Sequence, residues 1–168
     1  ITGNGEPAKE HGVSNLVILT RPESRGQLRL RSADPLDKPI IDANYLSDER
    51  DREVLRRGVR IARGIFNQPA YDRYRGREYL PGAECQSDEE LDAFFRDTCL
   101  VNYEAVGTCK MGYDELAVVN DKLQVHGIEG LRVVDGSVMP RITTGDPSAT
   151  IIMIAEKAAE MILQAARA

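Results

Sequence analysis

The sequence contains no tryptophan and only three cysteines, Cys85, Cys99 and Cys109. Their odd number excludes complete pairing into disulfides, and they lack the short Cys-x-x-Cys spacing of zinc sites. We therefore predict reduced thiols, no metal site and a cytoplasmic location. No apolar run approaches the length that spans a membrane, because Glu156 and Lys157 interrupt the longest one.

The sequence also lacks an excess of positive charge. The formal net charge is −5 and the pI is about 5.2, which argues against nucleic acid and anionic membranes as partners. Arginines and tyrosines do alternate between residues 69 and 87, a pattern that also occurs in proteins that stack on nucleotides. In an acidic chain, the favoured interpretation is a packed irregular loop whose arginine stems lie along apolar surface.

The first half of the chain predicts a small antiparallel sheet. Residues 1–15 show no periodicity and are predicted to form a flexible N-terminal segment. Residues 16–19 are apolar, and residues 27–31 alternate between apolar and polar side chains, as a half-buried strand does. With the turn-forming residues 22–26 between them, we expect a hairpin, followed by a short strand at residues 40–41.

Two helices are expected next. Ser47 and Asp48 mark a helix start, and that helix should run to about Asn67. Ser87 and Glu90 match a capping box, in which each residue bonds the backbone of the other, at the start of a second helix. The expected fold class is therefore α+β, with an antiparallel sheet and flanking helices.

The last third of the chain predicts a strand, a tight turn and a helix. Leu131, Val133 and Val134 form a short apolar run that precedes Asp135-Gly136, which is typical of a buried strand ending in a turn. Further on, Asp146 suits a helix N-cap and Pro147 suits the first helical position. The free N–H groups at that helix start form an electropositive spot that can hold an anion or a polarised carbonyl.

Several motifs follow one another in a fixed order along the chain. They are Val106–Gly112, Ala117–Val119, Leu123–Pro140 and Ile151–Ala159, with the upstream segments Leu19–Gly26 and Ile41–Leu46. The first four resemble the C-terminal part of the glucose-methanol-choline (GMC) family of FAD-dependent oxidoreductases, and the two upstream segments resemble the family's substrate-binding domain. Long motifs in a fixed order are far more specific than a single glycine motif.

The resemblance implies a division of the chain. Residues 16–112 would belong to the substrate-binding domain, and residues 113–168 would return through it, with a final strand and helix that complete the FAD-binding domain. The dinucleotide-binding pattern Gly-x-Gly-x-x-Gly between a strand and a helix is absent. We therefore expect a C-terminal fragment or subunit that is inactive alone and needs an N-terminal FAD-binding half, in the same or a separate chain.

The resemblance also indicates candidate catalytic residues. Where the family reads Tyr-His-Pro-x-Gly-Thr, this chain has Glu104 at the histidine position, and Asp146 stands at the position of a second Asn or His. Carboxylates are weaker bases than imidazole, but a buried pair can share a proton. The two acids are candidate proton handlers or a site for a cationic amine. Alternatively, Glu104 is solvated or paired with an arginine, and Asp146 only caps its helix.

Four further residues are implied to bind FAD. Asp135 and Gly136 match the turn near the ribityl chain and pyrophosphate, while Ser148 and Ala149 would face the pyrimidine edge of the isoalloxazine. The implied reaction is transfer of a hydride from an alcohol to flavin N5. The alternatives are an oxidoreductase for a cationic amine and a non-catalytic flavin- or ligand-binding module of the same fold.

Overall fold

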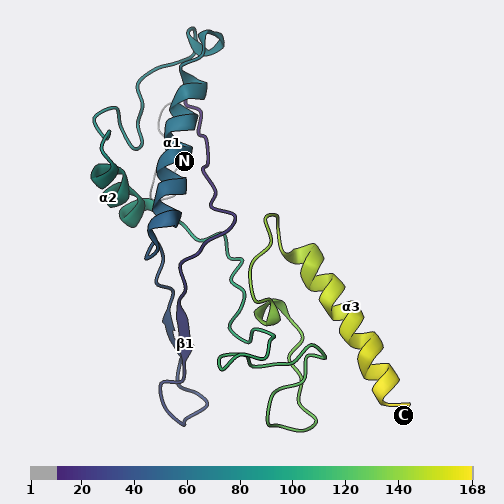
Figure 1. The fold of residues 1–168 in the computed structure, drawn as a ribbon. Helices are drawn as coiled ribbons and strands as arrows, with labels where there is room; N and C mark the ends of the chain where they lie inside the picture. Colours follow the sequence, from purple (N-terminus) through teal and green to yellow (C-terminus); the bar gives the residue numbers. More distant parts are fainter. Residues whose placement is uncertain (1–10, 168) are drawn as a thin grey trace. The chain divides into compact units, whose positions relative to one another are not determined.

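The structure is a computed structural model that describes residues 11–167. Its regular elements, drawn in Figure 1, are β1 (Gln27–Arg29), β2 (Ile40–Asp42), α1 (Glu49–Phe66), η1 (Pro69–Tyr71), α2 (Asp88–Thr98), η2 (Gly136–Val138) and α3 (Ser148–Ala165). The mixed α and β composition with an antiparallel sheet is confirmed. Most of the predicted flexible segment lies outside the described residues.

The chain forms two compact units. The first comprises residues 11–19, 23–25 and 44–101, and the second comprises residues 20–22, 26–43 and 102–167. The predicted domain boundary between residues 112 and 113 remains a prediction. Each unit has its own cluster of buried apolar side chains, described in turn below.

The helices of the first unit begin where the sequence predicts. The Asp48 side chain accepts the Arg50 backbone N–H at 2.9 Å and caps α1. At the start of α2, Ser87 and Glu90 form the predicted capping box, with both bonds present. The core between the two helices is made by Leu55, Val59, Cys85, Leu91 and Phe95.

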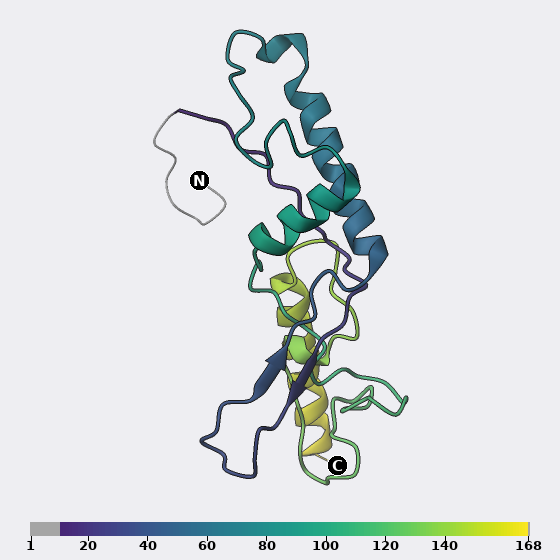
Figure 2. The same ribbon diagram turned by 90° about the vertical axis from the view of Figure 1, so that its left-hand side faces the viewer.

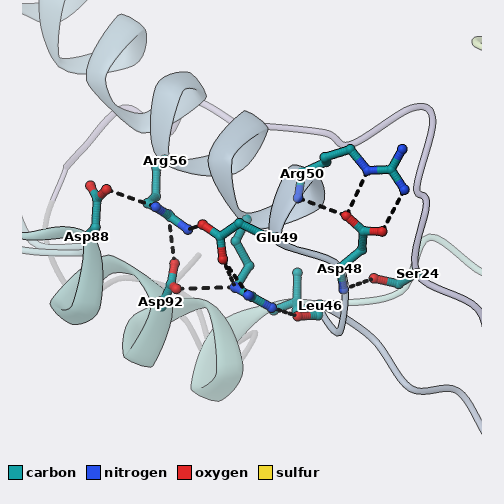
Figure 3. Close-up of polar contacts among 9 residues, drawn as sticks. Ser24, Leu46, Asp48, Glu49, Arg50, Arg56, Asp88 and Asp92 are labelled. Atoms are coloured by element: carbon teal, nitrogen blue, oxygen red, sulfur yellow. Dashed lines mark hydrogen bonds and ion pairs between the residues drawn. The ribbon is translucent and has the colours of Figure 1, made fainter.

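An ion cluster joins α1 to α2 beside this core (Figure 3). The buried Arg56 pairs through Nη1 with Asp88 Oδ2 at 2.8 Å and through Nε with Asp92 Oδ1 at 2.9 Å. Its second terminal nitrogen pairs with Glu49, and Arg52 Nε lies 3.3 Å from Asp92 Oδ2. A buried guanidinium is costly without partners, so these carboxylates offset its desolvation and raise the pKa of Arg56.

This cluster and the α1 cap predict a loss of stability in acid. Hydrogen bonds from the Arg50 side chain lower the pKa of Asp48 to about 2, and those from Arg56 lower the pKa of Glu49. A carboxyl group whose pKa is lower in the folded state stabilises the fold while it is ionised. This stabilisation is complete above the unfolded-state pKa of about 4 and disappears as the pH falls toward 2. We expect the urea midpoint to fall between about pH 5 and pH 2, and Asp48→Asn to reduce that fall. An equal pH dependence in the variant would contradict the assignment.

The hairpin of the second unit corrects the predicted strand pairing. Residues 16–19 form no strand, and β1 pairs with β2 in antiparallel register, with Leu28 opposite Ile41 (Figure 2). The turn between the strands explains this, because Asp34 Oδ1 accepts the Leu36 N–H at 2.9 Å and its carbonyl accepts the Asp37 N–H. All residues of β1 are exposed, so the predicted half-buried alternation is also wrong.

The four apolar residues 16–19 have a different role. Val17 and Leu19 pack against the core of the first unit, and the Val17 side chain lies directly over Gly58 of α1. Glycine at position 58 therefore leaves room for this contact. Packing, and not strand pairing, accounts for Val17 and Leu19, whereas Leu16 and Ile18 are exposed.

The predicted strand at residues 131–134 is also wrong. Only one isolated bridge forms there, between Gln124 and Arg132, and Gly127 and Gly130 take positive φ angles of 75° and 74° in the turn between the two segments. Residues 133 and 134 nevertheless pack against the core of the second unit. That core is made by Val119, Leu123, Val138 and Ala158.

Candidate functional site

The first part of the candidate site is the pairing of residues 106–111 with η2. The Cys109 N–H donates to the Ser137 carbonyl at 3.0 Å, and the Met111 N–H donates to the Val138 carbonyl at 2.8 Å. These two segments lie far apart in the sequence. The backbone bonds therefore place the segment that follows Glu104 beside the turn that contains Asp135 and Gly136.

Gly136 is the point where three predicted motifs meet. A Cβ atom there would lie 3.0 Å from Ile151 Cδ1 and 3.7 Å from Val106 Cγ1. Ile151 belongs to the first turn of α3, and Val106 lies two residues after Glu104. Glycine therefore allows the start of α3 to pack closely on this turn, and the space over its Cα atom is filled by protein side chains.

Asp135 caps η2. Its Oδ1 atom accepts the Ser137 backbone N–H at 2.8 Å and also pairs with the Ser137 hydroxyl. The residue is exposed, and within the described residues no donor to its Oδ2 atom is seen. One carboxylate oxygen therefore holds the turn, and the other suits a hydroxyl of a polyol chain such as ribityl.

The start of α3 is held by Asp146. Its Oδ1 atom accepts the Ser148 backbone N–H at 2.7 Å, and the hydroxyl and N–H of Ser148 lower the pKa of Asp146. The helix begins at Ser148, one residue later than predicted, although Pro147 already has helical angles of −73° and −10°. Asp146 therefore bonds the N–H at the start of α3 as predicted, but the first helical residue is Ser148 and not Pro147.

The first turn of α3 has the chemistry expected of a flavin contact. Ser148 and Ala149 are exposed there, and the first N–H groups of a helix have no acceptor within it. The helix dipole adds positive potential at this end. The Ser148 N–H is already donated to Asp146, so the Ala149 N–H is the donor of this pair that could meet a carbonyl or an anionic ring edge.

Glu104 is half-buried in the segment between α2 and Gly107. Val106, two residues later in the chain, lies at the Gly136 position. Asp146 is exposed and lies directly before α3. The structure therefore brings together the backbone segments that carry all six candidate residues. The contacts of Val106 and Ile151 with Gly136 were missed by the sequence analysis, and their only signal was the apolar side chains beside the motifs.

Other polar groups of the second unit have structural partners. His126 Nε2 lies 2.9 Å from the Gly112 carbonyl oxygen, and the imidazole ring makes a T-shaped contact with the Tyr113 ring. Within residues 11–167, no three acidic, histidine or cysteine side chains cluster in a way that could hold a metal ion. The helices in the same range are also too short or too polar to cross a bilayer.

Comparison with known sequences agrees with these motifs. A sequence model described as GMC oxidoreductase matches residues 22–155. Over 163 residues the chain is 53% identical to an oxygen-dependent choline dehydrogenase of Escherichia coli O17:K52:H18 (strain UMN026 / ExPEC). The match covers 96% of this chain but only 29% of that relative, so the chain spans less than a third of its length.

Solved structures with a similar fold include oxidoreductases and oxidases. One is an FAD-dependent oxidoreductase from Chaetomium thermophilum, with a TM-score of 0.80 and 35% identity over 88% of this chain and 26% of that one. Another is a fungal aryl-alcohol oxidase, with a TM-score of 0.80 and 36% identity over 89% of this chain and 25% of that one. The similarity thus covers nearly all of this chain and about a quarter of each structure.

Proposed function

The chain belongs to the GMC oxidoreductase family, and from this membership we propose that it is the C-terminal part of an FAD-dependent enzyme that oxidises a small alcohol. The observation that carries this proposal is the meeting of three family motifs at Gly136. The remaining part of the enzyme corresponds to the N-terminal portion of the choline dehydrogenase relatives. That portion supplies the contacts to the adenosine end of FAD.

FAD, when bound, supplies the acceptor for the hydride at flavin N5. The exposed first turn of α3, with Ser148 and Ala149, would hold the pyrimidine edge and stabilise the negative charge that develops there. Asp135 would accept a hydrogen bond from a ribityl hydroxyl. Gly136 supports both groups indirectly, because it lets α3 pack against the turn.

The two acidic residues have different proposed roles. Glu104 takes the proton of the substrate hydroxyl while the hydride leaves the adjacent carbon. Asp146 has a lowered pKa and therefore stays anionic at neutral pH, which makes it a poor proton acceptor. We assign Asp146 to electrostatic attraction of a cationic substrate group, such as the quaternary ammonium of choline.

The exposed hairpin supports a larger assembly. Leu28 is 51% exposed and Ile41 is 71% exposed, although both are apolar and opposite each other in the ribbon. A ribbon of two strands is at best marginally stable in water without further strands or a covering helix. The ribbon therefore fits a sheet whose other strands come from the N-terminal portion.

A second candidate is a non-catalytic module that binds a flavin or another ligand. It is favoured by one observation, that Asp146 already serves as a helix cap at a position where the family carries Asn or His. In that case both acids would be structural or solvated. The two candidates differ in whether any substrate reduces the bound flavin.

The test joins the 168-residue chain to the N-terminal portion of the E. coli choline dehydrogenase in one polypeptide. After gel filtration, the bound flavin is measured by its visible absorbance. Choline, an aromatic alcohol and a set of amines are then added without oxygen. We expect bleaching by an alcohol. Bleaching by amines alone would indicate the amine oxidoreductase, and a bound flavin that no compound bleaches would indicate the module.

A further inference from the structure

Ser137 makes hydrogen bonds to both sides of the site through different groups. Its backbone N–H donates to Asp135 Oδ1 at 2.8 Å, and its hydroxyl donates to the same oxygen atom. Its carbonyl oxygen accepts the Cys109 N–H at 3.0 Å. The serine is half-buried, whereas Asp135 is exposed. One residue therefore connects a proposed flavin contact to the segment that follows Glu104.

The turn does not need the Ser137 hydroxyl in order to form. The Val138 N–H donates to the Asp135 carbonyl at 3.3 Å, and the Met139 N–H donates to the Gly136 carbonyl at 3.2 Å. Like the N–H bond from residue 137 to the Asp135 side chain, these bonds use backbone donors that alanine at position 137 would keep. The hydroxyl bond is therefore available for a role other than folding the turn.

The hydroxyl fixes the orientation of the Asp135 carboxylate. With the backbone N–H as its only donor, the carboxylate would be free to rotate about a single hydrogen bond, and its second oxygen would sample several positions. A second donor to Oδ1 restricts this rotation. Oδ2 therefore keeps one position with its acceptor sites open. An acceptor that is already oriented loses little conformational entropy when a ligand binds.

The chemistry of Oδ2 selects one part of FAD. A carboxylate oxygen carries negative charge and only accepts hydrogen bonds, so it repels the anionic oxygens of a pyrophosphate. The ribityl chain, in contrast, is uncharged and carries hydroxyl donors. Of the two parts of FAD near which the resemblance places this turn, Asp135 therefore fits the ribityl chain.

We propose that Ser137 is a positioning residue for FAD, because its hydroxyl holds Asp135 Oδ2 ready to accept a ribityl hydroxyl. This inference rests on the proposed function and adds a residue that acts on the cofactor through Asp135. The carbonyl of the same serine keeps Cys109, and with it the segment after Glu104, at the same turn. Removal of the hydroxyl alone leaves this second bond in place.

Ser32 provides a matched control for Ser137. Its hydroxyl donates to Asp37 Oδ2 at 2.6 Å, in the turn between β1 and β2. Both serines therefore donate a hydroxyl bond to an aspartate of the second unit. Ser32→Ala removes the same kind of bond from a turn that carries none of the six candidate site residues.

The experiment measures the dissociation constant for FAD by titration of the joined polypeptide after its flavin has been removed. Ser137→Ala should weaken FAD binding roughly three- to tenfold, the loss expected when one more side chain has to be ordered on binding. Ser32→Ala should keep the wild-type constant. The titration is then repeated with FAD analogues that each lack one ribityl hydroxyl. For one of these analogues Ser137→Ala should make no difference, because the hydroxyl that Asp135 would accept is missing.

Asp135→Ala tests whether Ser137 acts through Asp135. In this background, Ser137→Ala should weaken FAD binding by less than about twofold further, since the serine hydroxyl no longer has its acceptor. A serine with only a structural role would weaken FAD binding by the same factor with or without the Asp135 side chain. It would also weaken all the analogues equally.

Either of those two structural outcomes would overturn the proposal, and so would equal FAD affinity in Ser137→Ala and the wild type. Thermal unfolding of the 168-residue chain completes the test, because a Ser137→Ala chain without a melting transition would show that the hydroxyl is needed for folding and that the proposal is wrong. A joined wild type that binds FAD but is bleached by no substrate would contradict alcohol oxidation and leave the titration decisive. A joined wild type that binds no FAD would contradict both.

Discussion

Glu104→Gln is expected to slow flavin reduction by about 10²- to 10⁴-fold, the range typical for loss of a general base. The substitution keeps the size of the side chain and removes its capacity to accept a proton. Hydride transfer then has to proceed from an alcohol whose proton has no acceptor. FAD binding should be unchanged, because the proposed flavin contacts lie at Asp135 and at the start of α3.

The measurement is rapid mixing of the joined polypeptide with its best substrate in the absence of oxygen. Glu115→Gln is the matched control, since it removes the same charge from an exposed position in the same unit. Flavin reduction should slow in Glu104→Gln and keep the wild-type rate in the control. A Glu104→Gln protein that is reduced at the wild-type rate would remove Glu104 from the mechanism.

Asp51→Ala is expected to lower the free energy of unfolding by about 3–5 kcal/mol. Asp51 is 2% exposed, and its two carboxylate oxygens accept the backbone N–H groups of Glu23 and Ser24, each at 2.8 Å. These bonds attach the segment before the hairpin to α1. Alanine would leave two half-buried donors without their acceptor and a small cavity where the buried carboxylate had been.

Thermal and urea unfolding of the 168-residue chain measure this effect. Glu53→Ala is the control, because Glu53 is exposed on the same helix and its removal should change stability by less than about 0.5 kcal/mol. Asp51→Asn keeps the shape and one carbonyl acceptor, so it should fall between the two. If Asp51→Ala were no less stable than Glu53→Ala, the buried carboxylate would have no structural role.

The importance of Asp51 was not predicted from the sequence, although a signal was present. Asp51, Leu55 and Val59 follow one another at intervals of four and therefore share one face of α1. An acid on the apolar face of a helix indicates a buried carboxylate with specific partners. Those partners come from residues 23 and 24, and nothing in the helix itself identifies them.

Strand pairing was also not predictable from local patterns. Residues 16–19 and 27–31 both have the composition of strands, but Val17 and Leu19 are half-buried against the core of the first unit. The turn at Asp34 then made residues 40–42 the nearest partner of β1. Apolar composition indicates that a segment will be buried, and tertiary packing decides which surface covers it.

The sequence by itself determined the family, the order of the motifs and the starts of α1 and α2. Helix caps and capping boxes depend on hydrogen bonds between residues two or three positions apart, so the pattern at Asp48 and Ser87 contains all the necessary information. The tertiary structure alone decided that Val106 and Ile151 meet over Gly136, and that Ile154, Ala158 and Met161 of α3 face the core of the second unit. Those contacts join residues far apart in the chain. Their stability comes from close packing, which no local sequence pattern encodes.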